Sequence, residues 1–465
     1  MTERYPLEPG PEEMRAMAES AGRFLERFIE DLPAAPAVDL EGAVERAREV
    51  RGPAPDLGRP FDDLLDQVWH SAEKAFNTAG PGYLAYIPGG GLYAAAVAEF
   101  LAAGLNRYVG MWNASPGLAQ IEWTALRWLG ELFGYPEEMR GITTTGGSLS
   151  NFSAIVAARV DRLGEDFLDG TMYTTEQTHA SVTKSARLAG FPERGIRTVP
   201  TDQGLRMDVD ALRSMVKEDR EAGRRPFLVV PSAGTTNTGA VDPIGDAVAL
   251  AREEGLWTHI DAAYGGFFQL TERGRRRFRG IEDAHSITLD PHKAMFLPYG
   301  TGVLLVREGR RLRDAHVVSG AYLQDLGAEE EIPNFTEYSP ELSRSFRGLS
   351  IWLPIQLHGL DAFRAALEEK LDLAGYVYDE LRDIPGLDVP WEPELSTVAF
   401  RLTDGDDDRN AALLERINAS RRVFLSSTRI EGRYWIRVCI VSHRTHRDRT
   451  EEAVEIIRGA VRDLT

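Results

Sequence analysis

Cysteine is nearly absent from this 465-residue chain, which contains only Cys439. A single cysteine cannot form an internal disulfide, and its place in the largely apolar run 434–441 predicts a packed strand residue rather than a nucleophile. A reducing, cytoplasmic compartment fits this composition. The N-terminus lacks a charged start followed by an apolar stretch, so we expect no signal peptide. The longest apolar region, 92–105, contains Glu99, and we expect no membrane span.

Positive charge is also scarce, with 53 Lys and Arg against 72 Asp and Glu, a net charge of −19. This balance argues against nucleic acid or an anionic membrane as a main partner. The nucleotide-binding patterns GxGxxG and GxxxxGK[ST] are absent. No metal site is predicted, because His443 and His446 have no acidic or cysteine partner at ligand spacing. The length predicts two or three domains, since single cores stop growing at roughly 250–300 residues.

Two apolar runs in the stretch 256–308 are followed by side chains of opposite charge. The run 257–260 stops at Asp261, and the run 286–289 is followed by the tetrapeptide DPHK, which ends at Lys293. Both runs have strand length and end in turn-forming residues. Strands separated by so short a stretch are expected to pair in one sheet. The acid and the amine would then meet at the edge where α/β sheets bind ligands.

An acid and an amine at one site suit pyridoxal phosphate, which needs a lysine to hold its aldehyde as a Schiff base and an acid to keep its pyridine nitrogen protonated. The segments HIDAAYGG and DPHK resemble the group II pyridoxal-phosphate-dependent amino-acid decarboxylases, the family of aromatic amino-acid and glutamate decarboxylases. The resemblance implies that Lys293 forms the Schiff base and that Asp261 contacts the pyridine nitrogen. It also implies cofactor contacts for Ala263 and His292. Asp290 stands where the family usually has Asn, which would alter the surroundings of the lysine.

Gly146, Gly147 and Ser148 come directly before a strongly helical segment. Glycines let the backbone approach an anion, the helix N-terminus adds partial positive charge, and the hydroxyl completes the site. This run matches the family's cofactor-phosphate loop, and Asn151 belongs to the same pattern. The alternative is a turn with a helix N-cap.

A histidine and two threonines complete the predicted cofactor site. His179 lies in a turn after a short strand, and the resemblance implies that its imidazole stacks on the cofactor ring and takes part in catalysis. Thr235 and Thr236 match a family turn beside the cofactor's ring and phenolic oxygen. The alternatives are a surface or capping histidine and threonines that bond only to their own turn.

The substrate is predicted from two segments that match the family by position. Tyr86, Ile87 and Pro88 would line the pocket, and Tyr108 and Gly110 would lie on a segment that reaches across a dimer. Gly89 and Gly110 replace the bulkier residues expected in animal aromatic decarboxylases, so the pocket could admit a larger ring. No basic residue stands out in these segments to pair with an acidic substrate side chain, which favours an aromatic L-amino acid. The alternative is a Gly-rich turn beside an aromatic core patch.

The polar stretch 316–343 has little periodicity and is expected to form a catalytic loop. The resemblance places Tyr322 where decarboxylases have a tyrosine that protonates the substrate's α-carbon, whereas relatives that oxidise the substrate to an aldehyde have Phe. We therefore expect an amine product. Arg344 and Arg347 follow a family pattern in which Ser345 replaces a common arginine, so a role for this segment in phosphate binding stays open.

The resemblance also implies the fold, an α/β fold of the aspartate aminotransferase-like type, fold type I of the PLP-dependent transferases. We expect an N-terminal helical arm and dimerisation segment over 1–80, a large PLP-binding domain with a mainly parallel seven-stranded sheet over 81–360, and a small α+β domain over 361–465. Within the arm, helices are predicted over 11–32 and 61–76, joined by an extended connection over 33–60.

The expected function is conversion of an L-amino acid, aromatic by the argument above, to its amine and carbon dioxide by a homodimer with active sites at the subunit interface. Other fold-type-I PLP enzymes are the alternatives: a decarboxylating aldehyde synthase, an aminotransferase or a lyase. A non-catalytic PLP-binding protein is a further alternative, which would tolerate loss of the loop tyrosine but not of the lysine.

Overall fold

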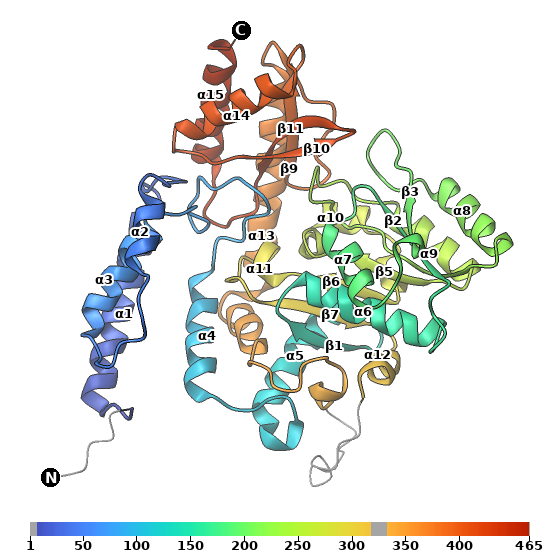
Figure 1. Ribbon diagram of the computed structural model, residues 1–465, viewed down its shortest axis with the longest axis horizontal. Coiled ribbons are helices and arrows are strands. Elements are labelled where there is room, and N and C mark those ends of the chain that lie inside the picture. The colour runs from blue at the N-terminus through green and yellow to red at the C-terminus, as the bar shows by residue number, and fades with distance from the viewer. Residues whose placement is uncertain (1–6, 318–332, 465) are drawn as a thin grey trace.

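The computed structural model describes residues 7–317 and 333–464 and shows an N-terminal arm, a large central domain and a smaller C-terminal domain (Figure 1). The arm consists of helices α1 (Pro11–Asp31), α2 (Ala43–Glu49) and α3 (Phe61–Ala72), drawn in blue beside the rest of the molecule. None of the residues in these helices is buried.

Aromatic contacts hold the arm together and join it to the C-terminal domain. Trp69 of α3 lies edge-on to Phe24 of α1, with ring centroids 5.3 Å apart. Beyond α3, Phe76 stacks on Phe424 of the C-terminal domain at 4.6 Å. The prediction of an unbroken extended connection over 33–60 is wrong, because α2 forms within it. Its sequence AVERARE consists mainly of strong helix formers.

The large domain is built on a seven-stranded sheet of order β1-β7-β6-β5-β4-β2-β3. Only β7 runs antiparallel to its neighbours, so the sheet is mainly parallel, as predicted. The central strands are buried along their whole length, which explains why they appear in the sequence as continuous apolar runs. The strands are β1 (Arg140–Thr144), β2 (Gly170–Thr175), β3 (Ile196–Val199), β4 (Arg225–Val229), β5 (Trp257–Asp261), β6 (Ser286–Leu289) and β7 (Gly302–Val306).

Helices pack around this sheet, and α6 contacts strands β4 to β7. Because β5 and β6 pair in parallel, with Asp261 opposite Thr288, both strands deliver the residues that follow them to the same edge, as expected. The helices of this domain are α4 (Tyr93–Leu105), α5 (Pro116–Leu132), α6 (Gly147–Arg162), α7 (Ala180–Leu188), α8 (Val209–Glu221), α9 (Ile244–Glu253), α10 (Glu272–Arg277), α11 (Pro291–Ala294) and α12 (Gly309–His316).

Helix α13 (Gly348–Arg382) joins the large domain to the C-terminal one and is broken at Gly359, whose φ is +72°. The break adjoins the boundary predicted at 360/361. The C-terminal domain has a four-stranded antiparallel sheet of order β10-β11-β9-β8. Its elements are β8 (Leu387–Asp388), β9 (Thr397–Leu402), α14 (Asp407–Ala419), β10 (Ser426–Ile430), β11 (Arg433–Cys439) and α15 (Arg447–Arg462).

Candidate active site

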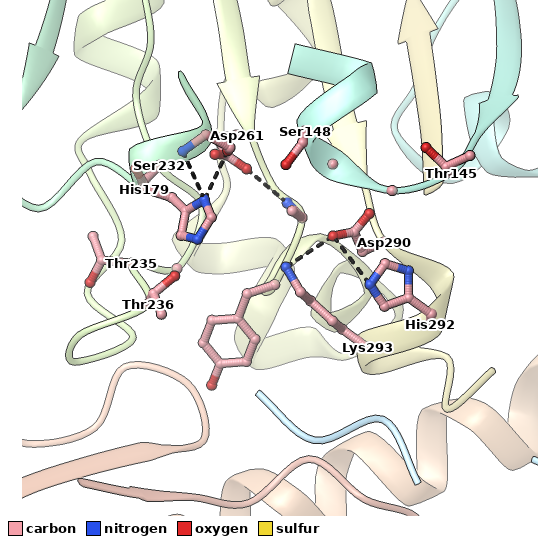
Figure 2. A pocket seen from close by; sticks show the side chains of 16 residues that line it. Thr145, Ser148, His179, Ser232, Thr235, Thr236, Asp261, Asp290, His292 and Lys293 are labelled. Atoms are coloured by element: carbon pink, nitrogen blue, oxygen red, sulfur yellow. Dashed lines mark hydrogen bonds and ion pairs between the residues drawn. The ribbon is translucent and has the colours of Figure 1, made fainter. Parts of the chain in front are cut away.

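A cavity of about 290 Å³ lies at the carboxyl ends of β5 and β6, beside the N-terminus of α6 (Figure 2). It brings together residues that are far apart in the sequence. Those predicted to contact a cofactor and found on its wall are Gly146, Gly147, Ser148, His179, Thr235, Thr236, Asp261, Ala263, His292 and Lys293.

Lys293 enters the cavity from the single-turn helix α11, and Asp290 caps the start of that turn. The Lys293 ammonium nitrogen lies 2.9 Å from Asp290 Oδ2, and the nearly buried carboxylate also has His292 Nε2 at 3.7 Å. The other carboxylate oxygen of Asp290 is buried without a hydrogen-bond partner among the described residues. The Asn-to-Asp difference noted in the sequence therefore places a carboxylate in direct contact with the candidate Schiff-base lysine.

The N-terminus of α6 forms the anion-binding end of the cavity. Gly146 precedes the helix with a φ of +148°, which a residue with a side chain rarely adopts. No side chain caps the helix, and within the described part of the chain the N–H groups of Gly147 and Ser148 find no acceptor. Two free amides, the Ser148 hydroxyl and the helix dipole therefore face the cavity and suit a phosphate group.

Asp261 faces the cavity from the end of β5, and two hydrogen bonds fix its carboxylate. Its Oδ1 accepts a hydrogen bond from the Ala263 N–H at 3.2 Å, and its Oδ2 accepts one from the Asn151 side-chain amide at 3.2 Å. Asn151 is fully buried and lies behind the wall rather than on it, next to His259. Burial lowers the pKa of His259 to about 4, so this imidazole is neutral at physiological pH.

His179 is the N-cap of α7, and its Nδ1 lies 2.8 Å from the Ser181 hydroxyl. Thr235 is buried in the cavity wall, where its hydroxyl bonds with that of Thr238 at 3.3 Å. The loop that carries Thr235 and Thr236 begins at Ser232, which pairs with Asp261 as an isolated bridge. The histidine, the threonine loop and the acid thus occupy one compact site.

The predicted substrate residues do not line this cavity. Tyr86 is about half exposed, with a φ of +53°, and its N–H donates to Ser426 Oγ while its carbonyl accepts from Arg437. Ile87 and Pro88 are buried next to it. The small domain therefore fixes the backbone of this segment.

Two glycines in the predicted substrate segments have a packing role. A Cβ on Gly89 would lie 2.0 Å from the His292 carbonyl oxygen, and one on Gly110 would lie 2.7 Å from the Tyr108 ring. Each glycine therefore permits close packing against a neighbour. That their missing side chains enlarge a substrate pocket stays a prediction.

Tyr322 lies outside the described residues. The arginines that follow the predicted catalytic loop do not line the cavity: Arg344 is buried in an ion pair with Glu122 of α5, and Arg347 forms a double hydrogen bond with Glu341 at 2.9 and 3.0 Å. Both guanidinium groups thus have carboxylate partners away from the N-terminus of α6.

Several wall residues were not predicted from the sequence to contact a cofactor: Thr145, Ser181, Ser232, Gly234, Tyr264 and Asp290. Ser181 lies two positions after His179, and Tyr264 directly follows Ala263. This closeness in sequence to predicted site residues is the only sequence feature that could have indicated them. Tyr264 links the cavity to the small domain, because its hydroxyl lies 2.8 Å from Ser396 Oγ. Burial raises the pKa of Tyr264 to about 12, so its phenol keeps its proton.

These groups fit pyridoxal phosphate. The cavity places an amine, a carboxylate, an imidazole and a helix N-terminus with unused amides around a space large enough for a phosphorylated pyridine ring. Together with the mainly parallel sheet, they define a fold-type-I PLP-dependent enzyme.

Comparison with known proteins gives the family. The pyridoxal-dependent decarboxylase conserved domain matches residues 48–403, and the chain belongs to that family. It is 33% identical to an aromatic-L-amino-acid decarboxylase of Bacillus atrophaeus, over 97% of this chain and 95% of the relative. It is 31% identical to an L-2,4-diaminobutyrate decarboxylase of Rhizobium meliloti (strain 1021), over 89% and 84% of the two chains.

A solved structure agrees with this assignment. Catharanthus roseus tryptophan decarboxylase in complex with L-tryptophan matches with a TM-score of 0.91 and 26% identity, over 99% of this chain and 100% of that one. The protein is therefore a PLP-dependent carboxy-lyase that acts on an L-amino acid. No helix in the described ranges is long and apolar enough to cross a membrane.

Proposed function

We propose that this enzyme decarboxylates an aromatic L-amino acid and releases the corresponding amine. One observation carries the choice of substrate: among the described residues that line the cavity there is no arginine, and the one lysine is paired with Asp290. A substrate with an acidic side chain would leave that charge without a cation. The names of the Bacillus atrophaeus and Catharanthus roseus relatives support an aromatic substrate, whereas the diaminobutyrate enzyme marks the competing possibility.

The wall residues take the roles that their positions allow. Lys293 would provide the amine that binds the cofactor's aldehyde, and the amides of Gly147 and Ser148 would hold its phosphate. Asp261 would keep the pyridine nitrogen protonated, and His179 would hold the ring. When bound, pyridoxal phosphate supplies a protonated ring that accepts the electron pair released as the bond between the α-carbon and the carboxylate breaks.

The product depends on what reaches the α-carbon after carbon dioxide leaves. We assign proton delivery to Tyr322, since a tyrosine hydroxyl can act as a general acid. This choice favours the amine over an aldehyde.

We further propose a cytoplasmic homodimer in which each subunit contributes to the other's site. Apolar side chains on the arm and on α4 are exposed in the single chain, among them Val68, Phe100, Leu101 and Leu105. A second copy of the chain would remove them from water. Sedimentation of the purified protein tests the assembly.

The substrate is tested by measuring carbon dioxide release from tryptophan, tyrosine, DOPA, phenylalanine, histidine, glutamate and 2,4-diaminobutyrate, with product identification by mass spectrometry. We expect turnover of at least one aromatic acid well above that of the others. Lys293→Ala is the matched control and should lose both the visible absorbance of bound cofactor and nearly all turnover. A preference for glutamate would refute the argument from the cavity's charges, and a preference for diaminobutyrate would refute the aromatic assignment.

A further inference from the structure

One buried side chain joins the two groups proposed to contact the cofactor ring. Asn151 lies in the first turns of α6, behind the cavity wall, and its amide reaches Asp261 on one side. On the other side it reaches Ser181, the hydrogen-bond partner of His179. We propose that Asn151 is a positioning residue that fixes the orientation and the hydrogen-bonding state of both Asp261 and His179. The proposal rests on the function proposed above.

The direction of each hydrogen bond at Asn151 follows from the acceptors that surround it. A carboxylate oxygen only accepts, so the atom 3.2 Å from Asp261 Oδ2 is the amide nitrogen, which donates. The second N–H of the same nitrogen donates to Ser181 Oγ at 3.0 Å. Rotating the amide by half a turn would place its carbonyl oxygen against the carboxylate, which is repulsive, so the network selects this orientation.

The carbonyl oxygen of Asn151 must then accept, and its donor is Nε2 of His259 at 2.9 Å. With its hydrogen on Nε2, the neutral imidazole accepts at Nδ1 from the Ser286 hydroxyl at 2.8 Å. The Trp257 indole N–H, which only donates, points at the same hydroxyl at 2.8 Å. A one-way chain of donors therefore runs from the indole to the carboxylate, through Trp257, Ser286, His259, Asn151 and Asp261.

Strand geometry explains how this polar chain crosses an otherwise apolar sheet. Trp257, His259 and Asp261 occupy alternate positions of β5 and so share one face, the face on which α6 packs. The side chains of the donor chain ahead of the acid are all fully buried. Burying a row of polar side chains is costly unless each of them has a hydrogen-bond partner. Here each donor has an acceptor, and the chain of hydrogen bonds ends at Asp261 in the cavity.

A second branch of hydrogen bonds runs from Asn151 through Ser181 and determines which ring nitrogen of His179 carries the hydrogen. Because Ser181 Oγ accepts from Asn151, its own hydrogen is free to bond to His179 Nδ1 at 2.8 Å, and the Ser181 backbone N–H points at the same ring nitrogen at 3.3 Å. With Nδ1 accepting, the neutral ring carries its hydrogen on Nε2. In Figure 2 that nitrogen lies on the side of the His179 ring that faces away from Asp261. One amide thus orients both the acid and the imidazole.

The first test measures binding of pyridoxal phosphate to full-length apoprotein, without substrate, by equilibrium dialysis. Asn151→Ala should weaken binding by about tenfold to 100-fold, as expected for loss of a buried hydrogen bond to a charged group. In an Asp261→Ala background the same change should alter binding by less than about twofold, because the asparagine acts through the acid. Equal losses in both backgrounds, or no loss in either, would overturn the proposal.

A matched control and a near-isosteric variant protect this test against misfolding. Ser153→Ala removes a hydroxyl from the same buried helix that has no hydrogen-bond partner within the described chain, and binding should stay within about twofold. Asn151→Asp keeps the acceptor for His259 but replaces the amide donor, so it should bind the cofactor at least as weakly as Asn151→Ala. Wild-type binding by Asn151→Asp would refute the donor role.

The second branch is tested separately through Ser181. Ser181→Ala should weaken cofactor binding less than Asn151→Ala does, because Asp261 keeps its amide donor, and should shift the pH profile of kcat/KM, because His179 loses its hydroxyl donor; Ser181→Thr should restore the profile. An unshifted profile in Ser181→Ala removes the branch to His179. A failure of the proposed substrate or product would appear in wild-type assays and would leave the binding results unchanged, so the two failures are distinguishable.

Discussion

Gly89 offers a direct test of how the predicted substrate segment packs against the turn that carries Lys293, the candidate Schiff-base lysine. An alanine Cβ at this position would lie 2.0 Å from the His292 carbonyl oxygen, and Lys293 is the next residue. Side-chain carbons essentially never approach other atoms closer than 3.0 Å, so one of the two segments must move by about 1 Å. A misplacement of about 1 Å at a catalytic group can cost on the order of 10²-fold in rate, or about 2.7 kcal/mol. We therefore expect Gly89→Ala to lower kcat/KM about 100-fold.

Gly91→Ala is the matched control, because it lies in the same loop with the opposite properties. Its φ is +68°, so an alanine there strains the backbone, but nothing lies within 4 Å of the added Cβ. We expect this variant to lose about 1 kcal/mol of stability and to keep its kcat/KM within a few-fold. Steady-state kinetics and thermal unfolding on both variants complete the assay. If Gly89→Ala retains wild-type kcat/KM, or if Gly91→Ala loses as much, contact with the lysine turn does not explain the glycine.

Three further outcomes are expected. Asp261→Ala should lower kcat about 10²- to 10³-fold at saturating cofactor, since the ring loses the group that keeps its nitrogen protonated; an active variant would remove that role. Tyr322→Phe should shift the product from amine to aldehyde, ammonia and peroxide with oxygen uptake and an unchanged cofactor spectrum, whereas amine at the normal rate would exclude Tyr322 as the proton donor. Burial raises the pKa of Asp242, which accepts the Ser232 and Met207 N–H groups at 2.7 Å, to about 6. Because the folded form holds this proton more tightly than the unfolded chain, stability should fall by about 2 kcal/mol between pH 4 and 6 relative to Asp242→Asn, as measured by thermal unfolding; parallel pH curves would contradict it.

The sequence alone was sufficient for the framework of the site. The runs that end at Asp261 and DPHK are short, apolar and β-branched or aromatic in character, and they form β5 and β6 as expected. Glycines before a helical pattern predicted the N-terminus of α6. The order of these motifs along the chain predicted the family. Neighbouring residues are enough to predict each of these features, because strand length, turn formation and helix starts depend on local sequence.

The tertiary structure decided what depends on distant neighbours. Asn151 sits in a loop-and-helix pattern typical of phosphate binding, yet its side chain bonds to an acid 110 positions later in the chain. Gly89 is a glycine because of a carbonyl oxygen more than 200 residues away, which no local pattern encodes. The pairing of Lys293 with Asp290 required the turn of α11 to form. Sequence patterns predict which elements form, whereas the direction and partner of each side chain follow from packing those elements together.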